Sequence, residues 1–340
     1  AQARHTAGVA ADPAGGGPVD VQDRSAVASA YTSRLAPALA TPVSWTGSTA
    51  RCDPGSSAPA TRAATLAAVP GAAQTSTVTL VGAGDIASCS QTNDSATARL
   101  LGRIPGTVFT LGDNVQGQGA WSEFRDCYNS TWGKYKERTR PTVGNHDYHT
   151  AGAKPYFNYF RWRAGRPRGY YSYDRGAWHI VALNSNCKEV GGCGKLSAQG
   201  RWLRRDLARH RARCTLAYFH HPLYASGIGE DSPEVKPFWH ILYNHHADVI
   251  LNGHAHRYER FARITPSGER SSARGIRQFI VGTGGAPGGS QKGPDEPRVQ
   301  AKKIDAPGVL KLELGSGLYH WKFVPVAGRN YTDSGRARCH

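Results

Sequence analysis

Five short apolar runs, each followed by an acidic, amide or imidazole side chain, constrain the fold of this 340-residue chain more than any other feature. Runs of this length that are rich in β-branched residues predict buried strands. In open α/β sheets, ligands collect at the ends of strands. The pattern therefore predicts a sheet-based domain in which one site gathers side chains from the segments 78–85, 108–114, 140–148, 216–222 and 249–256.

The polar residues at the ends of these runs are all of metal-ligand types. Carboxylate and amide oxygens suit hard cations, and imidazole nitrogens suit transition metals. Two aspartates, one asparagine and three histidines occur in the order Asp85, Asp113, Asn145, His220, His254 and His256. The sequence therefore predicts a metal centre at which distant parts of the chain meet.

The central run leads into Gly144-Asn145-His146-Asp147. An imidazole such as that of His146 can donate a proton near neutral pH, and a neighbouring carboxylate such as Asp147 can hold it in one orientation. Gly144 permits the tight backbone path that such crowding needs. A polar turn is the alternative interpretation, because Gly, Asn and Asp are common in turns. The four other runs favour the functional interpretation over five unrelated turns.

The ordered set of motifs resembles the calcineurin-like metallophosphoesterase superfamily over about residues 78–326. The string Gly253-His-Ala-His-Arg-Tyr-Glu-Arg260 is most similar to the purple acid phosphatase branch. Alternating strands and helices with added hairpins favour two mixed sheets packed together with helices outside. The resemblance implies the family's version of this α/β architecture, a four-layer α/β/β/α sandwich.

The resemblance also implies two metal ions and a division of the ligands between them. Asp113 would bridge the ions, because one carboxylate can bind two cations. A hydroxide on or between the metals would attack phosphorus, and the metals would absorb the developing charge. The first ion would bind Asp85, Asp113 and His256, and the second Asp113, Asn145, His220 and His254. The ions would be divalent, and Fe, Mn, Zn, Ca and Mg all remain open, with the histidines favouring transition metals.

The remaining site residues follow from the same resemblance. His146 would stabilise the charge on the phosphoryl group and protonate the leaving oxygen, with Asp147 as its orienter. Tyr148 and His149 are candidates for contact with the substrate because they follow directly in the sequence. The family pattern His-x-Pro favours His220 over His221 as the ligand. Three residues are candidates for a further ligand or for supporting the ligands, namely Asn114, Gln116 and His221.

The sequence departs from the family pattern at the first metal. Many superfamily members carry Asp-x-His in the first motif, whereas Ala87 stands at the histidine position here. Purple acid phosphatases place a tyrosine three residues after the second aspartate, and Gln116 stands there in this chain. Gln116 could supply an amide oxygen, or water could complete the shell. The first ion therefore has fewer evident protein ligands than in the purple acid phosphatases.

The charge balance favours anionic partners, with 42 Lys and Arg against 25 Asp and Glu and a net charge of +17. The preferred function is that of a phosphomonoesterase acting on a phosphorylated small molecule. A phosphodiesterase or nuclease on the same site is the first alternative, and a non-catalytic anion-binding surface protein is the second. No apolar run approaches the ~20 residues of a membrane span. The oligomeric state stays open.

Cysteine and methionine usage predicts export from the cell. The sequence has seven cysteines and no methionine even at position 1, which is typical of a mature, secreted chain after removal of a leader. Cys187 and Cys193 flank a glycine-containing loop and predict a disulfide. We propose Cys89–Cys127 and Cys214–Cys339 for the other pairs, which leaves Cys52 over. Reduced structural thiols are the alternative.

Composition divides the chain near residue 75. Residues 1–75 are rich in Ala, Gly and Pro and predict an arm that is weakly ordered or packed on the main domain. Residues 76–340 form the expected catalytic domain. Its expected helices are 95–103, 121–136, 197–211 and 233–245, and its expected strands and hairpins are 77–83, 107–111, 169–183, 215–219, 248–252, 278–285 and 309–325.

Overall fold

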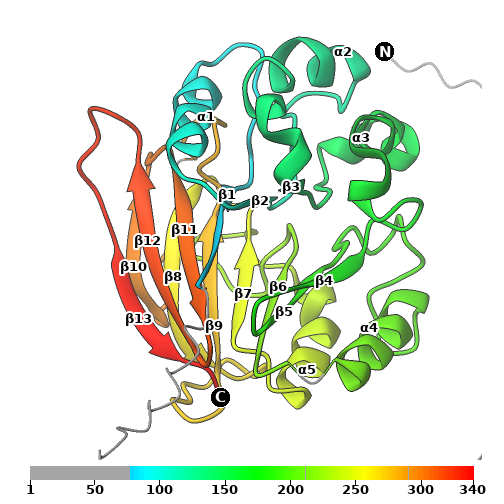
Figure 1. Ribbon diagram of the computed structural model, residues 1–340, viewed down its shortest axis with the longest axis vertical. Coiled ribbons are helices and arrows are strands. Elements are labelled where there is room, and N and C mark those ends of the chain that lie inside the picture. Colours follow the sequence, from blue (N-terminus) through cyan, green and yellow to red (C-terminus); the bar gives the residue numbers. More distant parts are fainter. Residues whose placement is uncertain (1–76, 211, 290) are drawn as a thin grey trace, which may run out of the picture. The chain divides into compact units, whose positions relative to one another are not determined.

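The computed structural model describes residues 77–210, 212–289 and 291–340 (Figure 1). The arm expected over residues 1–75, and Cys52 with it, lie outside these residues. Over the described ranges the strands form one six-stranded and one seven-stranded sheet. Among the helices of these ranges, none is long and apolar enough to cross a membrane.

The six-stranded sheet is mixed. β1 pairs in parallel with β2, and β2 with β3, whereas β11 runs antiparallel to β1. The expected hairpin near the C-terminal end is present as β11 and β12, and a further strand pairs with β12. In spatial order the strands are β13 (Ser334–Arg338), β12 (Leu318–Pro325), β11 (Gly308–Gly315), β1 (Val78–Ala83), β2 (Thr107–Thr110) and β3 (Thr139–Arg140).

The seven-stranded sheet is also mixed. Its centre is a parallel set formed by β5, β6, β7 and β9, and antiparallel strands complete both edges. The spatial order is β10 (Val299–Ile304), β8 (Arg257–Ile264), β9 (Ile276–Val281), β7 (Val249–Asn252), β6 (Cys214–Tyr218), β5 (Trp178–Ala182) and β4 (Tyr171–Arg175).

The buried side chains form two hydrophobic cores, one on each face of the seven-stranded sheet. This follows because successive residues of a strand point to opposite faces of the sheet. In β6, Leu216 belongs to the core shared by the two sheets, whereas Ala217 belongs to a second core. That second core contains Leu203 of α4 (Ala198–Arg209) and Phe238 of α5 (Lys236–Asn244). The expected four-layer α/β/β/α sandwich of two mixed sheets is confirmed, with α4 and α5 outside the seven-stranded sheet (Figure 1).

The helices beside the other sheet differ from expectation in two places. α1 (Asn93–Arg103) packs near β11 and starts two residues before the expected position. The prediction of a continuous helix over 121–136 is wrong. Hydroxyl groups of Ser130 and Thr131 bond back to the carbonyl of Cys127, and such bonds compete with the helical ladder. The segment instead comprises α2 (Trp121–Glu123), a π-helical turn at Phe124–Tyr128 and a 3-10 helix at Trp132–Arg138.

Short helices connect the remaining strands. Among them, α3 begins with a proline in its first turn, where the missing N–H costs least. In order they are 3-10 turns at Asp147–His149 and Ala151–Ala153, α3 (Lys154–Phe160), and 3-10 turns at Arg161–Ala164 and Pro233–Val235.

Three disulfides join the described cysteines as proposed from the sequence. Cys187–Cys193 closes a short loop after β5. Cys89–Cys127 ties the loop after β1 to the helical segment that precedes β3. Cys214–Cys339 fastens the C-terminal end of the chain to the first residue of β6.

Candidate metal centre

The parallel strands bring the predicted ligands to one place. Asp85 and Asp113 follow β1 and β2, and Asn145 follows β3. On the other sheet, His220 and the pair at 254 and 256 follow β6 and β7. Because the carboxyl ends of parallel strands share one edge of a sheet, the ligands from both sheets meet where these edges adjoin.

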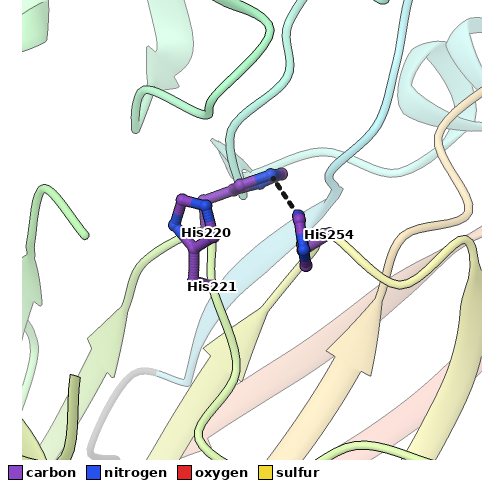
Figure 2. A group of neighbouring side chains, drawn as sticks. All are labelled: His220, His221 and His254. Carbon is purple, nitrogen blue, oxygen red and sulfur yellow. Dashed lines mark hydrogen bonds between the residues drawn. The ribbon is translucent and has the colours of Figure 1, made fainter. Parts of the chain in front are cut away.

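An amide and two imidazoles form the centre of this group. Nε2 of His220 lies 2.9 Å from Oδ1 of Asn145, and Nδ1 of His254 lies 3.2 Å from the same oxygen. The two imidazole nitrogens are themselves 3.3 Å apart, which the dashed line in Figure 2 marks. Three potential ligand atoms from three separate segments thus surround one point.

Each of the two aspartates uses one oxygen for the backbone and directs the other toward imidazole. Oδ1 of Asp113 accepts the N–H of His146 at 2.8 Å, and Oδ2 lies 3.3 Å from Nε2 of His220. Oδ2 of Asp85 accepts the N–H of His254 at 2.9 Å, and Oδ1 lies 3.3 Å from Nε2 of His256. The Oδ1 atom of Asp85 is buried without a hydrogen-bond partner among the described residues.

This arrangement fits bound cations. Nδ1 of His220 lies 2.7 Å from the carbonyl oxygen of Leu111, and Nδ1 of His256 lies 3.1 Å from that of Pro287. Each Nδ1–H donates to its carbonyl, so in the neutral imidazole Nε2 carries the lone pair. Those lone pairs face carboxylate and amide oxygens, which are acceptors too. Divalent cations would satisfy all of these acceptors together, with partly or fully buried ligands of the carboxylate, amide and imidazole types.

The backbone at the ligands adopts conformations that side chains rarely take. Asp85, Asp113 and His254 have φ angles of 58°, 46° and 71°. Such left-handed conformations cost of order 1 kcal/mol or more each and cluster at functional sites. At Gly144, an added Cβ would lie 2.1 Å from Oδ1 of Asp113, so no larger residue fits there without moving the carboxylate.

Electrostatics around the central aspartate favour the ionised form. Burial alone would raise the pKa of Asp113, but His220 and His146 outweigh burial and hold that pKa well below its usual range. The same carboxylate raises the pKa of His220 to about 9 against the effect of burial. Both shifts describe one attraction between a buried anion and the positive charge beside it, which is the position that a cation would occupy.

The contacts of His146 differ from those expected. Its Nδ1 lies 3.3 Å from the carbonyl oxygen of Gly117, and Nδ1 of His149 lies 2.8 Å from the same oxygen. Nε2 of His146 points toward the centre, 3.8 Å from Oδ2 of Asp113. The backbone carbonyl of Gly117, rather than Asp147, therefore orients the His146 ring.

Asp147 instead fastens two ligand loops together. Its fully buried carboxylate accepts the N–H of Gly144 at 2.9 Å and the side-chain amide of Asn114 at 2.9 Å. The expected contact between this carboxylate and the His146 ring is absent from the hydrogen bonds of the described residues. The carboxylate, at the start of the 3-10 turn Asp147–His149, is instead directed at the backbone N–H groups of Gly144 and Asn114. Burial and the charge of Asp113 raise the pKa of Asp147 to about 7.

Asn114 and Gln116, candidates for a further ligand, lie close to Asp113 in the sequence. The side-chain amide of Asn114 donates to Thr142 and Asp147. That of Gln116 donates to the backbone carbonyl of Asp113 at 3.4 Å. Through these contacts both side chains stabilise the loop after β2, which carries Asp113.

Comparison with known proteins agrees with this geometry. The family model described as "Calcineurin-like phosphoesterase" matches residues 79–258, which is more than half of the chain. The chain belongs to the calcineurin-like phosphoesterase family. All six proposed ligands lie inside the matched range.

Within the calcineurin-like phosphoesterases, the similarity is to purple acid phosphatases. Purple acid phosphatase 15 of Arabidopsis thaliana is 25% identical over 221 residues, which cover 53% of this chain and 40% of that protein. The chain thus spans less than half the length of this relative. Purple acid phosphatase PPD1 of yellow lupin has the same fold with a TM-score of 0.61 and 18% identity, covering 78% of this chain and 54% of that one.

The fold also occurs in a protein described by a structural role. GAP50, the anchor in the inner membrane complex of Plasmodium, superimposes with a TM-score of 0.60 at 14% identity. The match covers 78% of this chain and 89% of that one. The calcineurin-like phosphoesterase fold by itself therefore does not specify an activity, and the ligands must carry that argument.

A cavity of about 680 Å³ opens beside the metal centre of this family member. Asn145 forms part of its wall together with Tyr148, His149 and His221. Tyr148 and His149, the candidates for substrate contact, thus line this cavity. The ring of His221 packs 4.8 Å from the rings of both His220 and His254 (Figure 2), and its Nδ1 lies 2.8 Å from the hydroxyl of Ser185.

The sequence analysis missed one wall of the cavity, which is formed by Ser185, Asn186 and the loop that Cys187 and Cys193 close. The disulfide spacing predicted the loop, but no motif places it beside the metal ligands. The structure brings them together because β5 and β6 are parallel neighbours, so the segments that follow these strands emerge side by side.

A second group of aspartates and histidines has a different character. His179 is fully buried between Oδ1 of Asp174 at 2.7 Å and Oδ2 of Asp206 at 2.9 Å. The His210 ring stacks on it at 4.3 Å with an angle of 9° between the planes. Both nitrogens of His179 are used in ordinary hydrogen bonds, and two parallel rings cannot both direct an in-plane lone pair at one ion. We interpret this group as a structural imidazolium between carboxylates.

Proposed function

We propose that the protein is a metal-dependent phosphomonoesterase with two divalent cations in the centre described above. The convergence of Asn145, His220 and His254 on one point carries this proposal, because an amide oxygen and two imidazole nitrogens within 2.9–3.3 Å of one another can all bind one shared cation. The purple acid phosphatase relatives support the reaction class. Phosphate esters of small molecules are the proposed substrates.

The ligands divide as the resemblance implies. Asp85 and His256 would hold the first ion, and Asn145, His220 and His254 the second. Asp113 would bridge the two ions. When bound, the ions would supply Lewis acidity for the phosphate oxygens and for the attacking water. Gln116, which donates its amide N–H to a backbone carbonyl, adds no anionic ligand to the first ion.

His146 would act on the substrate directly. Its Nδ1–H donates to Gly117, and its Nε2 faces the centre with the side chain 30% exposed. A protonated ring in this position would donate a hydrogen bond to a phosphate oxygen and then a proton to the leaving alkoxide. Asp147 would serve indirectly by holding the loops that carry Asp113 and Asn145. His149, whose Nδ1 also lies beside the carbonyl oxygen of Gly117, would contact the substrate from the cavity wall.

Export from the cell is a further part of the proposal. The three disulfides among the described cysteines support an oxidising compartment, since such bonds are rare in the cytosol. A secreted phosphatase would release phosphate from small esters outside the cell.

Hydrolysis of matched aryl esters tests the function. The purified protein, supplied in turn with Mn²⁺, Zn²⁺, Fe²⁺, Mg²⁺ and Ca²⁺, should hydrolyse p-nitrophenyl phosphate with a higher kcat/KM than bis(p-nitrophenyl) phosphate. A higher kcat/KM for the diester would identify a phosphodiesterase. No hydrolysis of either ester with any of these ions, despite measured metal binding, would favour an anion-binding protein on the same scaffold.

A further inference from the structure

The cavity beside the proposed metal ligands is also lined by charged side chains that the proposed reaction does not use. Lys188 and Glu189 lie in the loop closed by Cys187 and Cys193, and Glu234 lies in the 3-10 turn before α5. All three line the same cavity as Asn145. A phosphate ester bound at the metal centre would therefore extend its alcohol part toward these charges.

The two carboxylates are free to interact with a ligand. Among the ion pairs of residues 77–340 that the structure describes, none involves Lys188, Glu189 or Glu234. Leaving histidines aside, two carboxylates and one ammonium group face the cavity. The net charge of these three side chains is therefore negative, whereas the whole chain has a net charge of +17.

Glu189 also lies near Tyr148, and both residues line this cavity. Burial raises the pKa of Tyr148, a hydrogen bond from Asn184 opposes this, and the charge of Glu189 adds to the rise. The carboxylate therefore lies within electrostatic reach of a hydroxyl on the opposite part of the cavity wall. Arg168 lines an adjacent cavity of about 380 Å³ that shares Tyr148 and Glu189 with the first.

The wall is held in place before any ligand arrives. The side chain of Gln199 in α4 bonds both the N–H and the carbonyl of Asn184, at 2.8 and 2.9 Å. The amide of Asn184 donates to the hydroxyl of Tyr148 at 2.9 Å, and the disulfide closes the loop that follows. These contacts hold the backbone from which Glu189 extends, and the N–H of Glu189 donates to the carbonyl of Asn186 at 3.0 Å.

We propose that Glu189 and Glu234 determine specificity and select phosphate monoesters whose alcohol part carries a positive charge, such as an amino alcohol, over esters with an anionic alcohol part. The proposal rests on the proposed function for the position of the phosphate. An anionic alcohol part would meet uncompensated carboxylates, which is a repulsive element against the wrong substrate. A nucleic acid, with further phosphates on both sides, would meet the same repulsion.

Binding of non-hydrolysable phosphonates tests this selectivity without relying on turnover. The full-length, metal-loaded protein would be titrated by calorimetry with 2-aminoethylphosphonate, propylphosphonate and 3-phosphonopropionate, which differ mainly in the charge of the chain. We expect the cationic compound to bind about tenfold more tightly than the anionic one, since a single exposed charge pair is worth up to about fivefold. Equal affinities, or tighter binding of the anionic compound through Arg168, would overturn the proposal.

Charge-neutral variants assign the effect to residues. Glu189→Gln and Glu234→Gln should each reduce the ratio of the two affinities about threefold, and Lys188→Gln should increase it by a similar factor. Binding of the neutral propylphosphonate should stay within about twofold of wild type in all three. Glu269→Gln is the matched control, since Glu269 is an exposed carboxylate outside the cavity wall. An unchanged ratio in both glutamate variants with unchanged melting temperatures would contradict the assignment.

Turnover separates this proposal from the proposed function. Wild-type protein would be assayed with phosphoethanolamine, propyl phosphate and phosphoglycolate. Hydrolysis of propyl phosphate together with a preference for phosphoethanolamine supports both. Charge-selective phosphonate binding without hydrolysis of any ester would reject the phosphomonoesterase and retain the specificity residues. Hydrolysis of all three esters at equal kcat/KM would support the phosphomonoesterase and reject Glu189 and Glu234 as specificity residues.

Discussion

The backbone N–H of His146 donates a 2.8 Å hydrogen bond to Oδ1 of Asp113, a residue 33 positions earlier in the chain. This bond joins two of the five motifs directly. It leaves Oδ2 of Asp113 directed at His220, which comes from the other sheet. The carboxylate proposed to bridge the ions is thus oriented by the segment that supplies the proposed proton donor, so metal binding and proton transfer would depend on each other.

Substitutions of single proposed ligands should differ in the number of metal ions that the protein loses. Chelation should abolish hydrolysis, and added Mn²⁺ or Zn²⁺ should restore it. Asp113→Ala should reduce bound metal from two ions to none, because both ions share this carboxylate. His256→Ala and His254→Ala should each lose one ion. Elemental analysis of the purified variants measures this, and full activity in a sample verified to be free of metal would reject the two-metal centre.

Loss of the His146 ring should affect chemistry more than metal binding. His146→Ala should lower kcat by about 10²- to 10⁴-fold with two ions retained. The loss should be smaller for p-nitrophenyl phosphate than for an alkyl phosphate, because the aryl leaving group needs no proton. His221→Ala is a useful comparison, since that ring also lies beside the centre but bonds to Ser185. An equal loss for both esters would indicate a purely electrostatic role for His146.

The glutamine at position 116 should leave the protein uncoloured. The colour of purple acid phosphatases comes from charge transfer between a tyrosinate and ferric iron, and a neutral amide has no comparable donor orbital. Visible absorption spectra with a parallel iron analysis check this, and divalent ions should suffice for activity. Gln116→Tyr loaded with iron is the informative variant. A strong visible band in the wild-type protein at stoichiometric iron would mean that another tyrosine binds the first ion.

Space at Gly144 should decide whether the centre forms. Gly144→Ala places a methyl group 2.1 Å from Oδ1 of Asp113, so the carboxylate must move and both ions should be lost. Gly194→Ala is the matched control, because an added Cβ there meets nothing within 4 Å. Metal content and melting temperature of the two variants would be compared. Retention of two ions in Gly144→Ala would show that the loop relaxes without cost.

The buried imidazole of His179 should make stability depend on pH. Burial lowers its pKa, but the hydrogen bonds to Asp206 and Asp174 outweigh burial, so the folded pKa is raised. A raised pKa means that this stabilisation is complete below the unfolded value of about 6.5 and is lost as pH rises through the folded value. The stacked ring of His210 is the other titratable group that faces it.

Urea unfolding of His179→Ala at several pH values tests this. The variant should be less stable than wild type by about 3 kcal/mol near pH 5.5, and the difference should shrink as pH rises above neutrality. His320→Ala, at an exposed position on β12, should show no such pH dependence. A difference that grows with pH would mean that His179 is neutral in the folded protein.

The sequence predicted the buried strands of this fold well and the polar ones poorly. β1 and β2 are continuous apolar runs that end in ligands, so one pattern located both the strand and the site. β8 was not predicted, and its charged residues Arg257 and Glu259 interrupt the apolar pattern that marks a buried strand. Both side chains are buried and bond to each other at 2.7 Å. β10 and β13 are polar edge strands, whose pairing depends on neighbours distant in the sequence.

The same distinction applies to the site. The types and order of the six proposed ligands were visible because they follow five strands, with His254 and His256 both after β7. The orientation of His146 was not, since a backbone carbonyl leaves no mark in a sequence motif and an adjacent aspartate is an obvious but wrong partner. The charged cavity wall was hidden for a related reason, because Glu189 and Glu234 come from loops that only the sheet order brings together.

The left-handed backbone at Asp85, Asp113 and His254 means that the chain is locally less stable at its ligands than it would be with glycine there. Bound cations offset this strain, but a chain that no longer binds them has no such compensation. Substitution by glycine at one of these positions would therefore relieve local backbone strain at the same time as it removes a proposed ligand. The gain is limited by what the same side chains do for the backbone, because the hydrogen bonds that Asp85 accepts from His254 and Asp113 accepts from His146 would be lost with them.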